Sequence, residues 1–142
     1  MSIYKKLVVY YFSGTGNSEN VAYWMANVAR ENGVEVSLIS IAKTDRRGIK
    51  PSEPETLVAF VSPIHGFNYP PVMLNFLIHF PKGKNNVLLL NTRAGMLIGK
   101  WNVPGLTGIA FYFAAFILKL KGYFIKSMFP VDLPSNWISV HP

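Results

Sequence analysis

Six consecutive small or hydrogen-bonding residues follow the first apolar run of the chain and precede a helix-like pattern. They are Ser13, Gly14, Thr15, Gly16, Asn17 and Ser18. Three hydroxyls, one side-chain amide and the unpaired N–H groups of a helix start can hold a phosphate dianion without a cation. The same residue types also form ordinary turns that cap helices. Their position directly after the first apolar run favours the phosphate-binding interpretation.

The sequence of this loop excludes two common kinds of phosphate-binding loop. A Walker A loop needs Gly-Lys-Ser/Thr, and no lysine is present. A dinucleotide-binding fingerprint needs G-x-G-x-x-G, and Glu19 stands where the third glycine would be. What remains is a neutral cradle of hydroxyls and amides, which suits a terminal monophosphate better than a triphosphate.

Length and composition predict one globular domain over residues 1–142. Half of the residues are hydrophobic and 15% are charged, which excludes a disordered chain. The chain has no cysteine, so disulfides, thiolate metal sites, iron–sulfur clusters and cysteine nucleophiles are excluded. The histidines His65, His79 and His141 lack metal-ligand spacing, and we expect no metal site. Redox chemistry would therefore need a bound organic cofactor.

The positive charge is unevenly distributed along the chain. The net charge is +7, and residues 57–142 carry seven lysines and arginines against Asp132 alone. We expect this part to attract anionic partners. Because no dense basic cluster is interleaved with aromatics, we expect no nucleic-acid surface. The first apolar run is too short for a signal peptide, which makes a cytoplasmic location the expectation.

Apolar runs and helical spacings alternate along the chain. Strands are predicted at residues 5–11, 34–39, 56–62, 86–91 and, from a weaker pattern, 123–131. Helical patterns cover residues 18–32, 70–80 and 104 to about 119. This alternation predicts a parallel sheet that is covered on both faces and built with right-handed crossovers. The polar segment 42–55 is expected to be a surface connection.

Residues 101–118 form an uncharged stretch that is close to the length needed to span a bilayer. Pro104, Gly105 and Gly108 dilute its first part. We expect a helix buried against the sheet. A transmembrane helix is one alternative, and an apolar face that meets a partner or a membrane is another.

The loop at residues 13–18 resembles the FMN-phosphate loop of flavodoxins, and two later segments agree with that family. They follow the third and fourth predicted strands. The resemblance implies a three-layer α/β sandwich whose five parallel strands lie in the order 2-1-3-4-5. It also implies noncovalent FMN binding and a role as an electron carrier. Besides residues 13–18, the site residues that it implies are Pro63, Ile64, His65, Gly66, Phe67, Asn91, Thr92, Arg93, Ala94 and Gly95.

The resemblance also implies a role for each segment. Residues 13–18 would hold the phosphate, and His65 would lie against the flavin ring. The peptide at Gly66 could turn a carbonyl toward ring N5–H after reduction, since glycine tolerates positive φ. The N–H groups of residues 92–95 would face the pyrimidine end of the ring. His65 is also compatible with a plain loop residue, and Arg93 with either a contact to reduced flavin at N1 or a solvated charge.

Segments 91–101, 104–108 and 130–142 look like a narrower bacterial family, in which a flavodoxin-like domain precedes a ferredoxin-like one. No ferredoxin module follows Pro142, so we expect either a fragment or a protein that finds its partner in another chain. The basic C-terminal part fits a ferredoxin-like or other redox partner. The alternatives are an FMN-dependent NAD(P)H or quinone oxidoreductase on the same fold, and a binding module whose flavin site has decayed.

Overall fold

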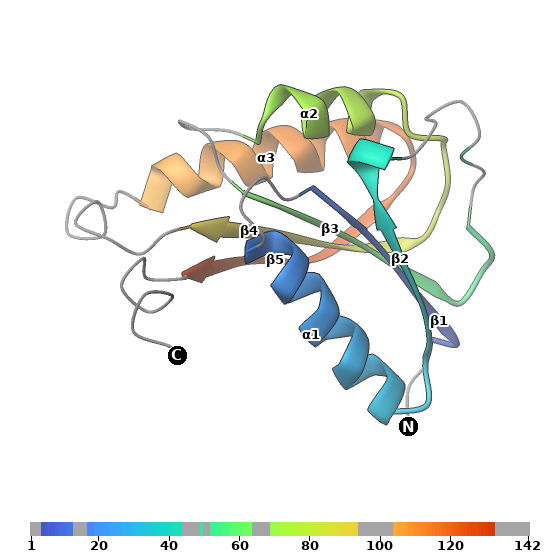
Figure 1. Ribbon diagram of the computed structural model, residues 1–142. Helices are drawn as coiled ribbons and strands as arrows, with labels where there is room; N and C mark the ends of the chain where they lie inside the picture. Colours follow the sequence, from blue (N-terminus) through green and yellow to red (C-terminus); the bar gives the residue numbers. More distant parts are fainter. Residues whose placement is uncertain are drawn as a thin grey trace, which may run out of the picture.

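The computed structural model describes residues 4–12, 17–43, 49, 52–63, 69–93 and 104–132. Within them, five parallel strands form one sheet in the order β2-β1-β3-β4-β5 (Figure 1). The strands are β1 (Lys6–Tyr11), β2 (Glu35–Ser40), β3 (Thr56–Pro63), β4 (Asn86–Arg93) and β5 (Phe124–Asp132). The helices are α1 (Asn17–Glu31), α2 (Pro71–Ile78) and α3 (Pro104–Leu120), with a short 3-10 helix η1 (Ile41–Lys43). The predicted elements and the strand order are confirmed.

The direction of each crossover decides which face a helix covers. The chain moves from β1 to β2 in one direction along the sheet, and from β3 through β4 to β5 in the other. Because crossovers between parallel strands are right-handed, these two directions place their helices on opposite faces. Figure 1 shows α1 on one face of the sheet and α2 with α3 on the other.

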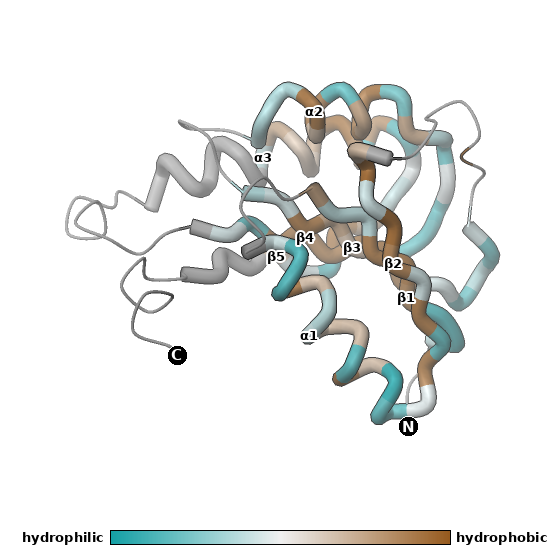
Figure 2. The backbone as a smooth tube through the Cα atoms, in the orientation of Figure 1, coloured by the Kyte–Doolittle hydropathy of each residue, from teal (hydrophilic) through white to brown (hydrophobic). Residues whose placement is uncertain are grey.

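Each face of the sheet has its own hydrophobic core. The core under α1 is aliphatic, with Leu7, Val9, Val21, Ala22, Val34, Ala59, Val61 and Leu90. The core under α2 and α3 contains a cluster of aromatic rings whose centroids lie 5.1–6.4 Å apart, formed by Tyr10, Phe60, Phe76 and Phe80. Figure 2 shows the strongly hydrophobic segments running along the strands. Burial on both faces explains why these strands lack the alternation of a half-exposed sheet.

Helix α3 packs on the sheet through small and aliphatic residues. Ala114, Ala115 and Leu118 are buried, whereas Tyr112 and Phe116 are 70% and 63% exposed. The prediction of a helix buried against the sheet is therefore confirmed for its inner side. No helix in the described part of the chain is long and apolar enough to cross a membrane. Half of the connection expected at 42–55 lies outside the described residues, and Ile49 packs against the core under α2 and α3.

Glycines terminate α1 and α3 in the same way. The N–H of Gly122 donates to the carbonyl of Lys119, and the next N–H, of Tyr123, donates to that of Leu118. Gly33 forms the equivalent bond at the end of α1. Both glycines have positive φ, +78° at Gly33 and +105° at Gly122. The two hydrogen bonds and the left-handed glycine together form the Schellman motif that commonly ends helices. The surroundings differ, since a Cβ at Gly33 would meet open space and one at Gly122 would collide with the carbonyl oxygen of Gly83.

We expect Gly122→Ala to destabilise the protein more than Gly33→Ala. Both substitutions impose the left-handed conformation on alanine, at about 1–2 kcal/mol. Gly122→Ala also forces the Gly83 backbone away, which costs about 1–3 kcal/mol more. Urea denaturation of both variants measures the difference, and Gly33→Ala serves as the matched control. Equal losses of unfolding free energy would show that the Gly83 contact is unimportant.

Candidate functional site

The strand order reverses between β1 and β3. These two strands are paired, with Tyr11 opposite Val61, yet the chain leaves them toward opposite edges of the sheet. A reversal of this kind opens a crevice at the carboxyl ends of the strands, where open α/β sheets bind ligands. The backbone N–H of Phe12 donates to the carbonyl of Val61 at 3.0 Å. The chain segments that follow β1 and β3 therefore depart from neighbouring points on this edge.

Several predicted site residues lie outside the described part of the chain. These are Ser13, Gly14, Thr15, Gly16, Ile64, His65, Gly66, Phe67, Ala94 and Gly95. The backbones of Asn17 and Arg93 are described, at the start of α1 and the end of β4. The structure describes four predicted site residues in full, backbone and side chain: Ser18, Pro63, Asn91 and Thr92. They show how the chain is arranged at the ends of the predicted site segments.

Ser18 and Thr92 join the start of α1 to the end of β4. Their hydroxyl oxygens Oγ and Oγ1 are 2.9 Å apart, and the side chains are only 1% and 4% exposed. Either hydroxyl can be the donor. Two predicted site residues that are 74 positions apart in sequence are therefore in direct contact. This bond fixes the helix start, with its unpaired N–H groups, against the strand that precedes the second predicted ring segment.

We expect Thr92→Val to lower the free energy of unfolding by about 1–3 kcal/mol, because it leaves the buried Ser18 hydroxyl without its partner. The double variant Ser18→Ala with Thr92→Val removes both polar groups, and we expect it to recover part of that loss. Urea denaturation of the two variants and the wild type completes the comparison. A single variant as stable as the wild type would contradict a structural role for this bond.

Asn91 carries a fully buried amide that has no hydrogen-bond partner among the described residues. Its side chain is 0% exposed, and neither Nδ2 nor Oδ1 has a hydrogen-bond partner in the described part of the chain. An unsatisfied buried polar group costs about 1–3 kcal/mol. Most buried polar groups in proteins are paired, so an exception calls for a physical explanation.

The carboxyl ends of β3 and β4 differ from the sequence-based expectation. The strands were predicted to end at residues 62 and 91, whereas β3 continues through Pro63 and β4 through Thr92 and Arg93. Pro63 is the last residue of β3 and lies opposite Thr92 in β4. Proline is tolerated at the end of a strand because it lacks a backbone N–H, and at that position the loss removes a single donor from the hydrogen bonds between strands. Asn91 and Thr92 of β4 are buried, so the change from apolar to polar sequence after Leu90 does not mark the strand end.

Tyr69 is a structural residue of this edge that sequence reasoning missed. Its hydroxyl donates to the carbonyl oxygen of Leu90 in β4 at 3.2 Å, and its side chain is 2% exposed. Burial raises the pKa of the Tyr69 phenol, which therefore stays a neutral donor. The bond ties the chain directly before α2 to β4. The sequence feature that could have indicated this role is the position of the tyrosine, directly before the Pro70-Pro71 pair at the start of the predicted helix.

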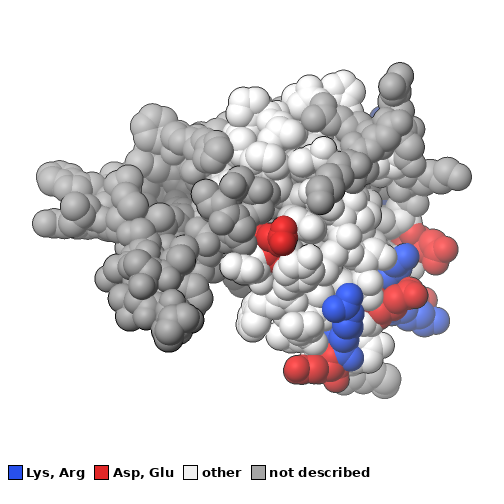
Figure 3. Space-filling model, in the orientation of Figure 1, with Lys and Arg blue, Asp and Glu red and all other residues white. Residues whose placement is uncertain are grey.

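Glu19 and Tyr11 are titratable side chains near this edge whose surroundings the structure describes. Glu19 lies in the first turn of α1, where it interacts favourably with the helix dipole. Partial burial, together with neighbouring Tyr23 and Glu19, raises the pKa of the Tyr11 phenol, so Tyr11 adds no negative charge. Figure 3 shows the face that carries α1: most described charges gather at the lower right, around the C-terminal end of α1, and one acidic side chain lies near the centre.

No protein-family model matches the chain, and no curated protein sequence matches it either. Solved structures do match. The two-electron reduced flavodoxin of Megasphaera elsdenii is 16% identical with a TM-score of 0.68, over 92% of this chain and 89% of that one. A Fusobacterium nucleatum flavodoxin bound to flavin mononucleotide is 11% identical with a TM-score of 0.58, over 85% and 68% of the two chains.

A larger redox protein contains a similar unit. The rubredoxin oxygen:oxidoreductase of Desulfovibrio gigas is 18% identical with a TM-score of 0.62, and the match covers 92% of this chain and 31% of that chain. At these identities the likeness establishes the fold alone. The expected flavodoxin-like three-layer α/β architecture is therefore confirmed.

Proposed function

We propose that this chain binds FMN noncovalently at the carboxyl edge of its sheet and acts as an electron carrier. The observation that carries the proposal is that β1, which precedes the neutral sequence 13–16, ends where the strand order reverses. The helix α1 begins directly after that sequence, at Asn17. That is where an open α/β sheet binds phosphate-bearing ligands.

The described residues at this edge fit FMN. A monophosphate dianion needs donors rather than a cation, and the start of α1 presents unpaired backbone N–H groups, to which the loop at residues 13–16 would add hydroxyls. The hydroxyl pair of Ser18 and Thr92 holds that helix start in place. The buried amide of Asn91 supplies donors and an acceptor that the described protein leaves unused. Flavodoxins, among them one with bound flavin mononucleotide, share the fold.

The cofactor and the protein would have separate roles. Bound FMN would supply the redox chemistry, and the protein would supply binding, orientation and exclusion of water. Residues 13–17 would hold the phosphate, and the segments after β3 and β4 would enclose the ring. Tyr69 and Pro63 anchor the two ends of the segment that contains His65 and Gly66. The segments 63–70 and 91–96 contain no Asp or Glu, so these two segments would add no carboxylate that opposes negative charge on a reduced ring.

Stopped-flow mixing of the FMN-loaded protein with NADH or NADPH distinguishes the carrier from a reductase. A carrier has no site for a nicotinamide, and we expect slow reduction that speeds up when a separate reductase is added. Rapid two-electron reduction by the nucleotide alone would identify an FMN-dependent oxidoreductase instead.

The basic C-terminal part supports a partner with an acidic docking surface. Lys119 and Lys126 are exposed, and no carboxylate pairs with either among the described residues. Such a field speeds association with an acidic protein and weakens with salt. A ferredoxin-like protein of the cytoplasm is the partner that we propose, in keeping with the resemblance to the narrower flavodoxin–ferredoxin family. Electron transfer to an acidic ferredoxin should slow as ionic strength rises.

A further inference from the structure

The buried amide of Asn91 stands at the boundary between the aromatic core and the carboxyl edge. Side chains alternate along β4, so Asn91 shares a face with Leu89 and Val87, which belong to the core under α2 and α3. Asn91 is the next residue on this face beyond Leu89, toward the carboxyl end. It is therefore the first polar side chain that β4 presents on this face beyond the core.

The neighbouring strand has a polar residue at the same level. Ser62 of β3 lies directly opposite Asn91 in the strand register, and both side chains are 0% exposed. The Ser62 hydroxyl donates to the carbonyl oxygen of Pro63 at 3.2 Å, so its proton is used locally. Both polar atoms of the Asn91 side chain stay unpaired within the described part of the chain. Ser62 and Asn91 therefore form a pair of neighbouring polar side chains near the carboxyl ends of β3 and β4. This pair comes directly before the segments proposed to enclose the flavin ring.

The chemistry of an amide specifies the group that would complement it. A carboxamide presents an N–H donor beside a C=O acceptor, so it pairs best with a ligand edge that has an acceptor beside a donor. The flavin ring has one such edge, the imide, where N3–H lies between two carbonyl groups. We propose that the Asn91 side chain pairs with the imide edge of the flavin. This inference rests on the proposed FMN function and assigns the contact to a side chain rather than to backbone N–H groups alone.

Two variants and three ligands test the contact. Asn91→Leu replaces the amide by an apolar side chain of similar shape. Asn91→Ala introduces a smaller side chain, and it keeps the test valid if leucine does not fit. Each apo protein is titrated with FMN, riboflavin and 3-methylriboflavin, whose imide N–H is blocked. We expect both variants to bind FMN and riboflavin about 10- to 100-fold more weakly, by the same factor for each ligand.

The methylated ligand provides the decisive comparison. The wild type should bind riboflavin about tenfold or more tightly than 3-methylriboflavin, and the variants should lose most of that preference. In urea, we expect apo Asn91→Leu to unfold at or above the wild-type midpoint, because it removes an unpaired amide. Weaker flavin binding then cannot come from lost stability.

The outcomes separate this inference from the proposed function. If the wild type binds FMN but the Asn91 variants bind it equally well, or keep the full preference over 3-methylriboflavin, the assignment of Asn91 is wrong and FMN binding stands. The same holds if a variant loses affinity for FMN but not for riboflavin, since the contact would then be to the phosphate. If the wild type binds neither FMN nor riboflavin, both the proposed function and this inference fail.

Discussion

Replacing Ser13 and Thr15 together by alanine should weaken FMN binding by about 100-fold or more and leave riboflavin binding nearly unchanged. Hydrogen bonds to a charged group contribute about 1.5–3 kcal/mol each, and this loop has no lysine or arginine that could compensate. Two lost bonds therefore correspond to at least two orders of magnitude in affinity. Quenching of flavin fluorescence on binding provides both dissociation constants.

The control for this variant is Ser52→Ala, a hydroxyl deletion in the connection before β3. It should bind both flavins as the wild type does. The contrast between the two ligands is the informative quantity, because riboflavin has the ring and ribityl chain but lacks the phosphate. An equal loss for both flavins would place these hydroxyls at another part of the cofactor. Unchanged FMN affinity would show that the Ser13 and Thr15 hydroxyls do not hold the phosphate.

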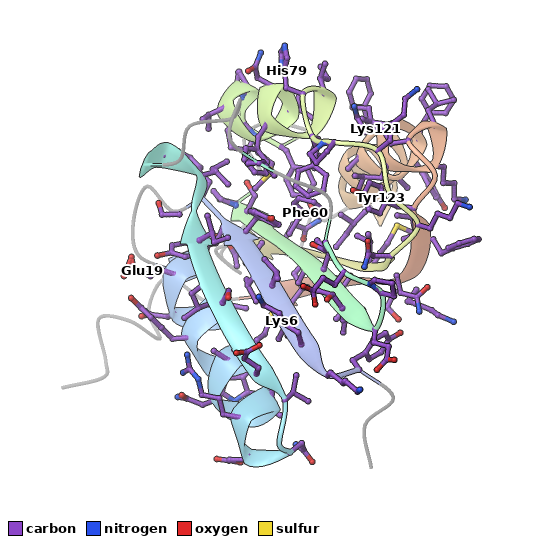
Figure 4. All side chains as sticks on the ribbon, turned by 90° about the vertical axis from the view of Figure 1, so that its right-hand side faces the viewer. Lys6, Glu19, Phe60, His79, Lys121 and Tyr123 are labelled. Carbon is purple, nitrogen blue, oxygen red and sulfur yellow. The ribbon has the colours of Figure 1, made fainter. Side chains whose placement is uncertain are left out.

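Phe60→Ala should lower the free energy of unfolding by about 3–5 kcal/mol. Phe60 is fully buried, and its ring centroid lies 5.6 Å from that of Tyr10 and 5.1 Å from that of Phe80. Figure 4 shows it between the sheet and α2. The expected loss is a large part of the roughly 5–15 kcal/mol by which a domain is usually stable.

Phe116→Ala is the matched control, because it deletes the same side chain from a position that is 63% exposed on α3. We expect it to change the free energy of unfolding by about 0.5 kcal/mol or less. Urea denaturation of the two variants compares burial directly. Similar losses at both positions would mean that the outer face of α3 is covered in solution, and a small loss at Phe60 would contradict the described core.

The fold was largely predictable because its strands are buried on both faces. Runs such as Leu7 to Tyr10 and Val87 to Leu90 are continuously apolar, and turn residues bound them clearly. The helix ends at Gly33 and Gly122 were also predictable, since the positive φ of this kind of helix end favours glycine. The strand order was available only through the resemblance, because no local pattern specifies which strands become neighbours.

The candidate site was less predictable because its contacts join distant parts of the chain. Nothing in the sequence near Ser18 indicates that its hydroxyl lies 2.9 Å from that of Thr92. The change from leucine to Asn91 suggested a strand end, whereas β4 continues through Arg93 and the side chains of Asn91 and Thr92 are buried. Tyr69 was missed for the same reason, since its partner is a backbone carbonyl in β4.

Titration of the wild-type apo protein with FMN and riboflavin tests the central claim most directly. We predict saturable one-to-one binding of FMN with a dissociation constant in the low-micromolar range or tighter, and clearly weaker binding of riboflavin. Equal affinity for the two flavins would contradict a phosphate site at the start of α1. No saturable binding of either flavin would contradict the assignment of this edge of the sheet as a flavin site.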